Sequence, residues 1–177
     1  MSNSFIIGIG GGSASGKSTF AEQLKAALPN AQLIHMDSYM KPTDKLPRAQ
    51  SPINGKPYPD YNHPQSWDLP KLHKDLVKAK AQVIIIEGAL ALHDPVVLEQ
   101  LNLKLFVDCR ADERVVRRLR RNMTRGMGFD EIADFYLDLV RYRHDEYVEP
   151  SKWRADMIIN GSGDFQTAIE IIARCIK

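Results

Sequence analysis

The chain has 177 residues, of which 44% are hydrophobic and 26% are charged, so a wholly disordered or fibrous protein is excluded. Its formal charge of +2 is far below that of most proteins that coat a polyanion. Two cysteines are too few for a disulfide framework, and no run approaches the ~18 apolar residues of a membrane span. Since the N-terminal residues also lack the basic region of a secretory signal, we expect a cytoplasmic protein in a reducing compartment.

Short apolar runs alternate along the chain with segments of helical period. The runs that predict strands are Phe5–Gly10, Gln32–Met36, Gln82–Glu87, Lys104–Asp108 and Asp156–Asn160. These runs are continuously apolar, as in strands that are buried on both faces of a parallel sheet. The alternation predicts a single domain over residues 1–177 with a three-layer α/β fold, in which helices cover both faces of a parallel sheet of about five strands.

The segment at about residues 40–67 interrupts this alternation. It contains six of the ten prolines of the chain, so it can form neither a long helix nor a central strand. Its aromatic residues Tyr58, Tyr61 and Trp67, together with His63, argue against simple disorder. We therefore expect an ordered flap over this segment.

A glycine-rich loop with the pattern G-x-x-x-x-G-K-[ST] separates the first expected strand from an amphipathic helix. In this context, rather than as a chance glycine turn, such a loop presents its backbone N–H groups to phosphates. Lys17 is expected to reach the β- and γ-phosphates, and the Ser18 hydroxyl to bind Mg²⁺. The predicted nucleotide-binding residues are Gly11, Gly12, Ser13, Ala14, Ser15, Gly16, Lys17, Ser18 and Thr19.

Two acids end expected strands. Glu87 ends an apolar run and is expected to hold Mg²⁺ directly or through water, although an acid in this position can also be an ordinary strand end. Asp37 follows the second run, and ligands of doubly wound sheets lie at the carboxyl ends of the strands. Asp37 could accept a proton from an attacking hydroxyl or could cap a helix, and the residues alone favour neither interpretation.

A stripe of arginines shares one face of an expected helix, with Val115, Val116, Leu119 and Met123 on the apolar side. The arginines are Arg114, Arg117, Arg118, Arg121 and Arg125. They could form a solvated basic face, a nucleic-acid contact or a lid over a transferring phosphoryl group. In a chain with a phosphate-binding loop the lid is favoured, and we expect it at about residues 111–128.

Together these residues resemble the uridine kinase and phosphoribulokinase family of P-loop kinases over nearly the whole chain. The loop Gly11–Ser18 matches the uridine kinase form, and residues 37–39 (Asp-Ser-Tyr) resemble the Asp-Ser-Phe-Tyr motif of the family. The segment Asp60–Pro64 resembles its Asn-Phe/Tyr-Asp-His-Pro motif, and Val83–Gly88 resembles its strand that ends in Glu-Gly. The ordered set is more specific than any single motif.

This resemblance implies the nucleoside and nucleotide kinase fold and transfer of the γ-phosphoryl group of ATP, with Mg²⁺, to a hydroxyl of a small nucleoside-like acceptor. It implies that Asp37 is the general base. The catalytic residues expected on this basis are Asp37, Lys17, Arg117, Arg121 and Arg125, and the metal ligands are Ser18 and Glu87. On the same basis the flap at about residues 40–67 is the candidate acceptor pocket. The expected acceptor-binding residues are Asp37, Tyr39, Tyr61, Asn62, His63 and Trp67. No nucleic-acid or membrane partner is expected, and a homo-oligomer remains open.

The acceptor side departs from the family pattern. Only Leu69 to Ala81 separates the His-Pro segment from the Glu-Gly strand, which leaves no room for the β-hairpin that recognises the pyrimidine in uridine kinases. The ribose-contacting Asp of the family falls at Asn62, and a substrate-contacting Gln falls at Phe135. A nicotinamide riboside, pantothenate or sugar-phosphate acceptor is therefore an alternative. An alternative of another class is a nucleotide-binding regulatory module or ATPase without an acceptor.

Overall fold

The structure is a computed structural model that describes residues 4–176. Its centre is a parallel sheet of five strands in the order β2-β5-β1-β6-β7. The strands are β1 (Phe5–Gly10), β2 (Ala31–His35), β5 (Val83–Glu87), β6 (Leu103–Asp108) and β7 (Met157–Asn160). Each strand begins and ends within one residue of a run that the sequence predicts.

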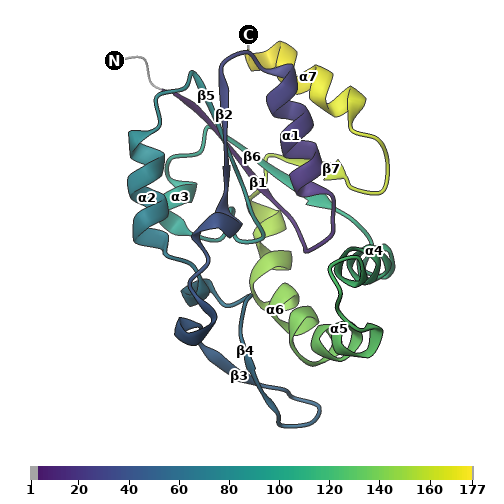
Figure 1. The fold of residues 1–177 in the computed structure, drawn as a ribbon. Helices are drawn as coiled ribbons and strands as arrows, with labels where there is room; N and C mark the ends of the chain where they lie inside the picture. The colour runs from purple at the N-terminus through teal and green to yellow at the C-terminus, as the bar shows by residue number, and fades with distance from the viewer. Residues whose placement is uncertain (1–3, 177) are drawn as a thin grey trace.

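Helices cover both faces of this sheet (Figure 1). The helices α1 (Lys17–Ala27) and α7 (Gln166–Ile176) pack on one face. The helices α2 (Leu69–Lys78) and α3 (Pro95–Leu98) pack on the other. This arrangement confirms the three-layer α/β fold expected from the sequence.

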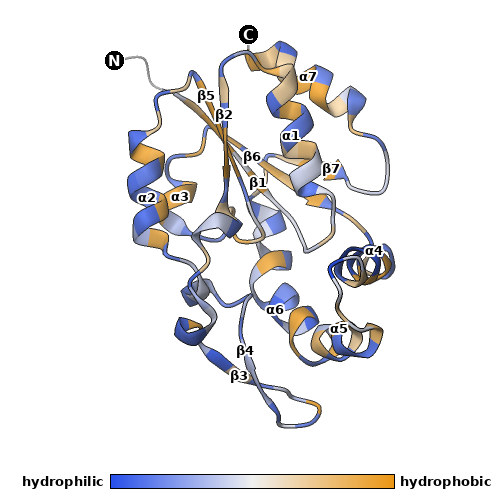
Figure 2. Ribbon diagram, viewed as in Figure 1, coloured by the Kyte–Doolittle hydropathy of each residue, from blue (hydrophilic) through white to orange (hydrophobic). Residues whose placement is uncertain are grey.

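Each face of the sheet carries its own apolar core. In β5, Val83 and Ile85 belong to the core that contains α1 and α7, whereas Ile84 and Ile86 belong to the core that contains α2 and α3. Because successive side chains of a strand point to opposite faces, a strand covered on both sides needs a continuous apolar run. Figure 2 shows the strands largely in orange and the covering helices banded in blue and orange. The two cores thus fix the positions of the strand ends.

The remaining helices lie beyond the carboxyl ends of the strands (Figure 1). After β6 come α4 (Ala111–Met123) and α5 (Phe129–Phe135). Helical turns then continue through α6 (Arg141–Arg143) to a 3₁₀ segment at Glu149–Arg154, which precedes β7. The expected site therefore lies between the sheet and these helices.

Helix α4 turns a polar face toward the rest of the molecule. Arg114 and Asn122 are buried, whereas Val116 and Met123 are 47% and 49% exposed. Val116 and Met123, which belong to the expected apolar side of this helix, therefore face away from the rest of the molecule. The physical reason is that α4 lies against the polar backbone of the glycine-rich loop and not against a face of the sheet.

Residues 40–67 hold a two-stranded antiparallel hairpin that the sequence analysis did not predict. Its strands are β3 (Arg48–Gln50) and β4 (Pro57–Pro59), and short 3₁₀ turns lie on either side at Thr43–Lys45 and Pro64–Ser66. The two ends of the segment are joined by a β-bridge between Met40 and Trp67. This bridge brings the segment back to the main domain beside α2.

Candidate active site

The glycine-rich loop of residues 11–18, here called the phosphate-binding loop, is shaped by two glycines with positive φ. Gly11 has φ +146°, and a Cβ atom there would lie 2.6 Å from the carbonyl oxygen of Val107. Gly16 has φ +101° and occupies the N-cap position of α1, where no side chain caps the helix. The first N–H groups of α1 therefore have no side-chain acceptor, which is the arrangement that suits a phosphate.

A cavity of about 690 Å³ opens beside this loop. Its volume is in the range of pockets that hold a small molecule or cofactor. It is lined by Ser13, Ala14, Gly16, Lys17, Ser18, Thr19, Asp37, Arg117, Arg121, Arg125, Gly161, Gly163 and Phe165. All five residues that the sequence predicts to be catalytic therefore line one cavity. The other predicted loop residues, Gly11, Gly12 and Ser15, lie behind this lining.

The expected metal ligands are in contact with each other. The Ser18 hydroxyl donates a hydrogen bond of 3.1 Å to Glu87 Oε2. Glu87 ends β5, whose five residues are all buried, and is itself only 3% exposed. A hydroxyl and a carboxylate are hard oxygen ligands of the kind that Mg²⁺ prefers, so this donor set fits the ion.

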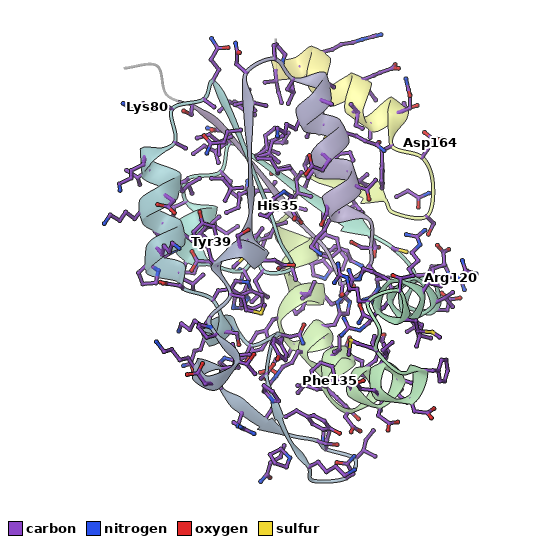
Figure 3. All side chains as sticks on the ribbon, viewed as in Figure 1. His35, Tyr39, Lys80, Arg120, Phe135 and Asp164 are labelled. Carbon is purple, nitrogen blue, oxygen red and sulfur yellow. The ribbon has the colours of Figure 1, made fainter. Side chains whose placement is uncertain are left out.

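Glu87 also contacts a histidine that the sequence did not predict to belong to the site. His35, the last residue of β2, places Nδ1 2.7 Å from Glu87 Oε1 and Nε2 3.3 Å from Glu22 Oε1 on α1. Figure 3 shows His35 near the centre of the molecule, where β2 ends. The signal that could have indicated it is a polar residue at the end of an apolar strand, two positions before Asp37. The sequence does not show that β2 pairs with β5, and this pairing is what brings His35 next to Glu87.

Asp37 lies in the 3₁₀ turn Met36–Tyr39 that follows β2, and it is exposed to the cavity. The N-cap position of that turn is His35, so Asp37 does not act as its cap. The negative charge of Asp37 also acts on Arg121. Burial and the neighbouring Arg125 lower the pKa of Arg121, and Asp37 opposes that shift. The Asp37 carboxylate and the Arg121 guanidinium therefore belong to the wall of the same cavity and interact across it through their charges.

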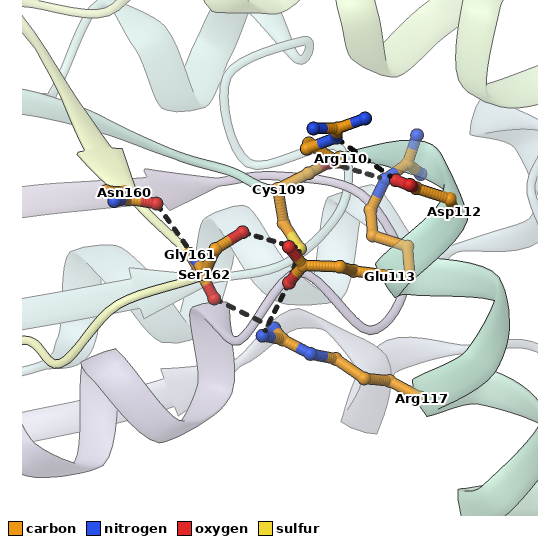
Figure 4. Close-up of polar contacts among 9 residues, drawn as sticks. Cys109, Arg110, Asp112, Glu113, Arg117, Asn160, Gly161 and Ser162 are labelled. Carbon is orange, nitrogen blue, oxygen red and sulfur yellow. Dashed lines mark hydrogen bonds and ion pairs between the residues drawn. The ribbon is translucent and has the colours of Figure 1, made fainter.

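The arginines of α4 reach the cavity from the other side. Arg117 donates hydrogen bonds to the carbonyl oxygen of Gly161 at 2.8 Å and to Glu113 at 3.1 Å, which fixes its guanidinium beside the loop after β7 (Figure 4). Figure 4 also shows the neighbours of Glu113. The Cys109 thiol lies close to the Glu113 carboxylate and to the Ser162 hydroxyl. Arg117 is thus held in the wall of the cavity.

Two further arginines of α4 contact the phosphate-binding loop directly. Arg118 and Arg121 donate hydrogen bonds of 3.0 and 3.3 Å to the Ser13 hydroxyl. Burial and the charge of Arg121 lower the pKa of Arg118. Arg114 is packed so closely on the loop that a Cβ atom at Gly12 would lie 2.6 Å from its Nη1. The helix therefore concentrates positive charge where a phosphate chain would lie.

The expected acceptor residues are separated into two groups. Asn62 and Trp67 line a small cavity of about 20 Å³ that also includes Ser13 of the phosphate-binding loop. Trp67 is only 3% exposed, and its indole Nε1 has no hydrogen-bond partner among the described residues. Because Ser13 lines both cavities, the small cavity adjoins the large one.

Tyr39, Tyr61 and His63 line neither of these cavities. The Tyr39 hydroxyl donates to Asp75 on α2 at 3.2 Å, and Figure 3 shows this residue on the side of α2. The Tyr61 hydroxyl lies 3.3 Å from that of Thr43. The ring of His63 accepts a hydrogen bond from the backbone N–H of Gln65 and packs edge-on against Tyr147. A role for these three residues in acceptor binding stays a prediction.

Comparison with known proteins places this site in a family. The family model described as "Phosphoribulokinase / Uridine kinase family" matches residues 53–168. A uridine kinase of Alkaliphilus metalliredigens (strain QYMF) is 34% identical over 206 positions, covering 100% of this chain and 97% of the relative. A uridine kinase of Clostridium botulinum (strain Okra / Type B1) is 34% identical over 201 positions, covering 100% and 98%.

The chain belongs to the phosphoribulokinase/uridine kinase family. Membership confirms the expected class of activity, phosphoryl transfer from ATP to an alcohol group. The alignment with the Alkaliphilus uridine kinase spans 206 positions for a chain of 177 residues, so that relative carries segments that this family member lacks. Within residues 4–176 no helix is both long enough and apolar enough to cross a membrane.

Solved structures share the fold of this uridine kinase family member. A possible uridine kinase from Bacillus stearothermophilus superposes with a TM-score of 0.58 at 18% identity, covering 90% of each chain. A shikimate kinase from Bacteroides thetaiotaomicron superposes with a TM-score of 0.59 at 16% identity, covering 97% of this chain and 98% of the other. At these identities the likeness concerns the fold alone.

Proposed function

We propose that this protein transfers the γ-phosphoryl group of ATP to a hydroxyl of a small nucleoside-like acceptor. Uridine is the first candidate, because relatives that match the whole chain carry the name uridine kinase. The observation that carries the proposal is the 690 Å³ cavity, which brings Asp37, Lys17 and Ser18 together with the arginines of α4 at the carboxyl ends of the strands. That edge is where sheets of this type bind ligands.

The phosphate-binding loop, α4 and Arg125 in the turn after α4 bind the triphosphate and the transferring phosphoryl group. Lys17 and the backbone N–H groups at the start of α1 bind the triphosphate. Mg²⁺, held by Ser18 and Glu87, neutralises charge on the phosphate oxygens when bound. Arg117, Arg121 and Arg125 offset the charge of the transferring group and exclude water from it.

The acceptor side depends on Asp37. Its carboxylate orients the acceptor hydroxyl and takes its proton while the hydroxyl oxygen attacks the γ-phosphorus and the bond to the β–γ bridging oxygen breaks. The cavity of about 20 Å³ beside Ser13 has room for about one water molecule, so an acceptor seated between Asn62 and Trp67 requires these side chains to move apart. Asn62 carries no charge, but its amide can still donate and accept hydrogen bonds with hydroxyl groups.

The proposal is tested by ADP release from Mg-ATP with and without uridine, in the wild type, in Asp37→Asn and in Asp44→Asn. Asp44 is a matched control because it is an exposed aspartate of the next turn and does not line the cavity. We expect uridine to stimulate the wild type and Asp44→Asn equally. Loss of the general base should lower the stimulated kcat of Asp37→Asn by about 10²–10⁴-fold. Full uridine-dependent turnover by Asp37→Asn would contradict the role of the base, and equal ADP release without any acceptor would contradict a kinase.

A further inference from the structure

The ends of β2 and β5 carry a polar pair inside an otherwise apolar sheet. His35 and Glu87 occupy partnered positions in the parallel register of the two strands, so their side chains lie on the same face. His35 Nδ1 lies 2.7 Å from Glu87 Oε1, and His35 Nε2 lies 3.3 Å from Glu22 Oε1. The three side chains form a connected chain from α1 through β2 to β5.

Both oxygens of Glu87 are used in this arrangement. Oε1 contacts His35 and Oε2 accepts from the Ser18 hydroxyl at 3.1 Å. The terminal torsion of a glutamate is broad when nothing restrains it, so two contacts on opposite oxygens define the plane of the carboxylate. Within residues 4–176 no lysine or arginine forms an ion pair with Glu87, although its side chain is only 4% exposed. The His35 Nδ1–H and the Ser18 hydroxyl are therefore the two donors that compensate the burial of this carboxylate.

His35 itself does not line the 690 Å³ cavity. Glu87 does not line it either, so the contacts that connect His35 to the cavity run through Glu87 to the Ser18 hydroxyl, which does line it. Residues that hydrogen-bond to a metal ligand from behind typically change metal affinity by about 10–100-fold when they are lost. This is the effect to expect of a side chain that fixes the orientation of a ligating carboxylate.

We propose that His35 is a positioning residue that holds Glu87 with Oε2 directed at Ser18, and that it thereby sets how strongly Mg²⁺ strengthens nucleotide binding. This inference rests on the proposed function, in which Ser18 and Glu87 hold the ion. It assigns a role to a residue of the second strand that neither the family comparison nor the cavity lining identifies.

The chain offers a matched control for the loss of such a pair. His73 on α2 places Nε2 2.8 Å from Asp94, whose side chain is also largely buried at 7% exposure. The His73–Asp94 pair lies beside α3, on the face of the sheet opposite α1, and lines no part of the large cavity. His73→Ala therefore reports what the loss of a buried histidine–carboxylate contact does to the protein in general.

The test measures the affinity for a non-hydrolysable ATP analogue in saturating Mg²⁺ and in EDTA, for the wild type, His35→Ala, His35→Asn and His73→Ala. We expect His35→Ala to weaken binding about tenfold in Mg²⁺ and to leave it unchanged in EDTA. Asparagine can place an amide N–H near the position of the histidine Nδ1. His35→Asn should therefore bind the analogue in Mg²⁺ almost as tightly as the wild type. His73→Ala should match the wild type in both conditions.

An equal loss in Mg²⁺ and in EDTA for His35→Ala, or no loss in either, would overturn the positioning role. The same conclusion follows if His73→Ala shows as large an effect in Mg²⁺ as His35→Ala. A wild-type affinity that does not respond to Mg²⁺ at all would contradict the metal site of the proposed function, and the inference would fall with it. The wild-type measurement alone therefore distinguishes a failure of the positioning role of His35 from a failure of the proposed metal site.

Discussion

His144 illustrates how the arginines of α4 impose their charge on neighbouring residues. Its ring nitrogens lie 3.1 and 3.4 Å from the guanidinium of Arg114, and its side chain is only 12% exposed. Burial and the charge of Arg114 lower the pKa of His144, while the carboxylates of Glu149 and Asp145 oppose the shift. The neutral imidazole is therefore favoured in the folded protein beside the phosphate-binding loop.

This shift predicts a loss of stability in mild acid. The unfolded chain binds a proton at His144 near the ordinary pKa of about 6.5, whereas the folded chain binds it only at lower pH, so unfolding is favoured as the pH falls below 6.5. His144→Asn should reduce the drop in melting temperature between pH 7.5 and 5.5. A part of the drop should remain, because burial and Arg154 also lower the pKa of His93. An equal drop in the variant and the wild type would contradict this assignment.

At the same scale, the loop residues and the two acids could be predicted because their chemistry is local. Lys17 and Ser18 follow from a contiguous motif, and Asp37 and Glu87 follow from the ends of apolar runs. His35 could not be predicted, since its importance comes from the pairing of β2 with β5, two strands separated by 47 residues of chain. Which strands are neighbours depends on the topology of the sheet, and this cannot be inferred from a single sequence.

Among the elements, the hairpin of β3 and β4 is held by a buried carboxylate on the helical stretch after α5. Asp138 is 3% exposed and accepts hydrogen bonds from Asn54 Nδ2 at 2.9 Å and from the Tyr58 hydroxyl at 3.1 Å. The Tyr58 ring also packs edge-on against Phe135. The strands are only three residues long and β4 contains two prolines, so no pattern in the sequence predicts them. The hairpin is therefore stabilised by its contacts with the helices and not by the strand propensity of its residues.

The docking predicts unequal costs for two tyrosine hydroxyls. Tyr58→Phe leaves the buried Asp138 with one donor fewer and should lower the free energy of unfolding by about 1–3 kcal/mol. Tyr61→Phe is the matched control, because the Tyr61 ring also packs on Phe135 but its hydroxyl contacts the Thr43 hydroxyl at an exposed position. It should cost less than about 0.5 kcal/mol. Urea denaturation compares the two, and equal losses would contradict the anchoring role of Asp138.

Over the whole molecule, the two apolar cores place five strand ends at one edge, and every residue proposed for phosphate chemistry lies at that edge. The fold follows from the sequence because buried parallel strands and amphipathic helices have strong periodic signals. The sequence does not show which face of α4 is buried, because the buried face is polar and packs against a loop. The acceptor pocket stays a prediction, since its residues come from separate segments that only the fold brings together.

The central claim is that this molecule transfers a phosphoryl group to an acceptor and does not merely hydrolyse ATP. The most direct measurement is phosphorus NMR of the products formed by the purified protein from Mg-ATP and uridine. We expect a phosphate monoester of uridine to accumulate in the same amount as ADP, while inorganic phosphate stays at the level of the protein-free control. Inorganic phosphate that accumulates in the same amount as ADP, with no ester formed, would contradict this claim.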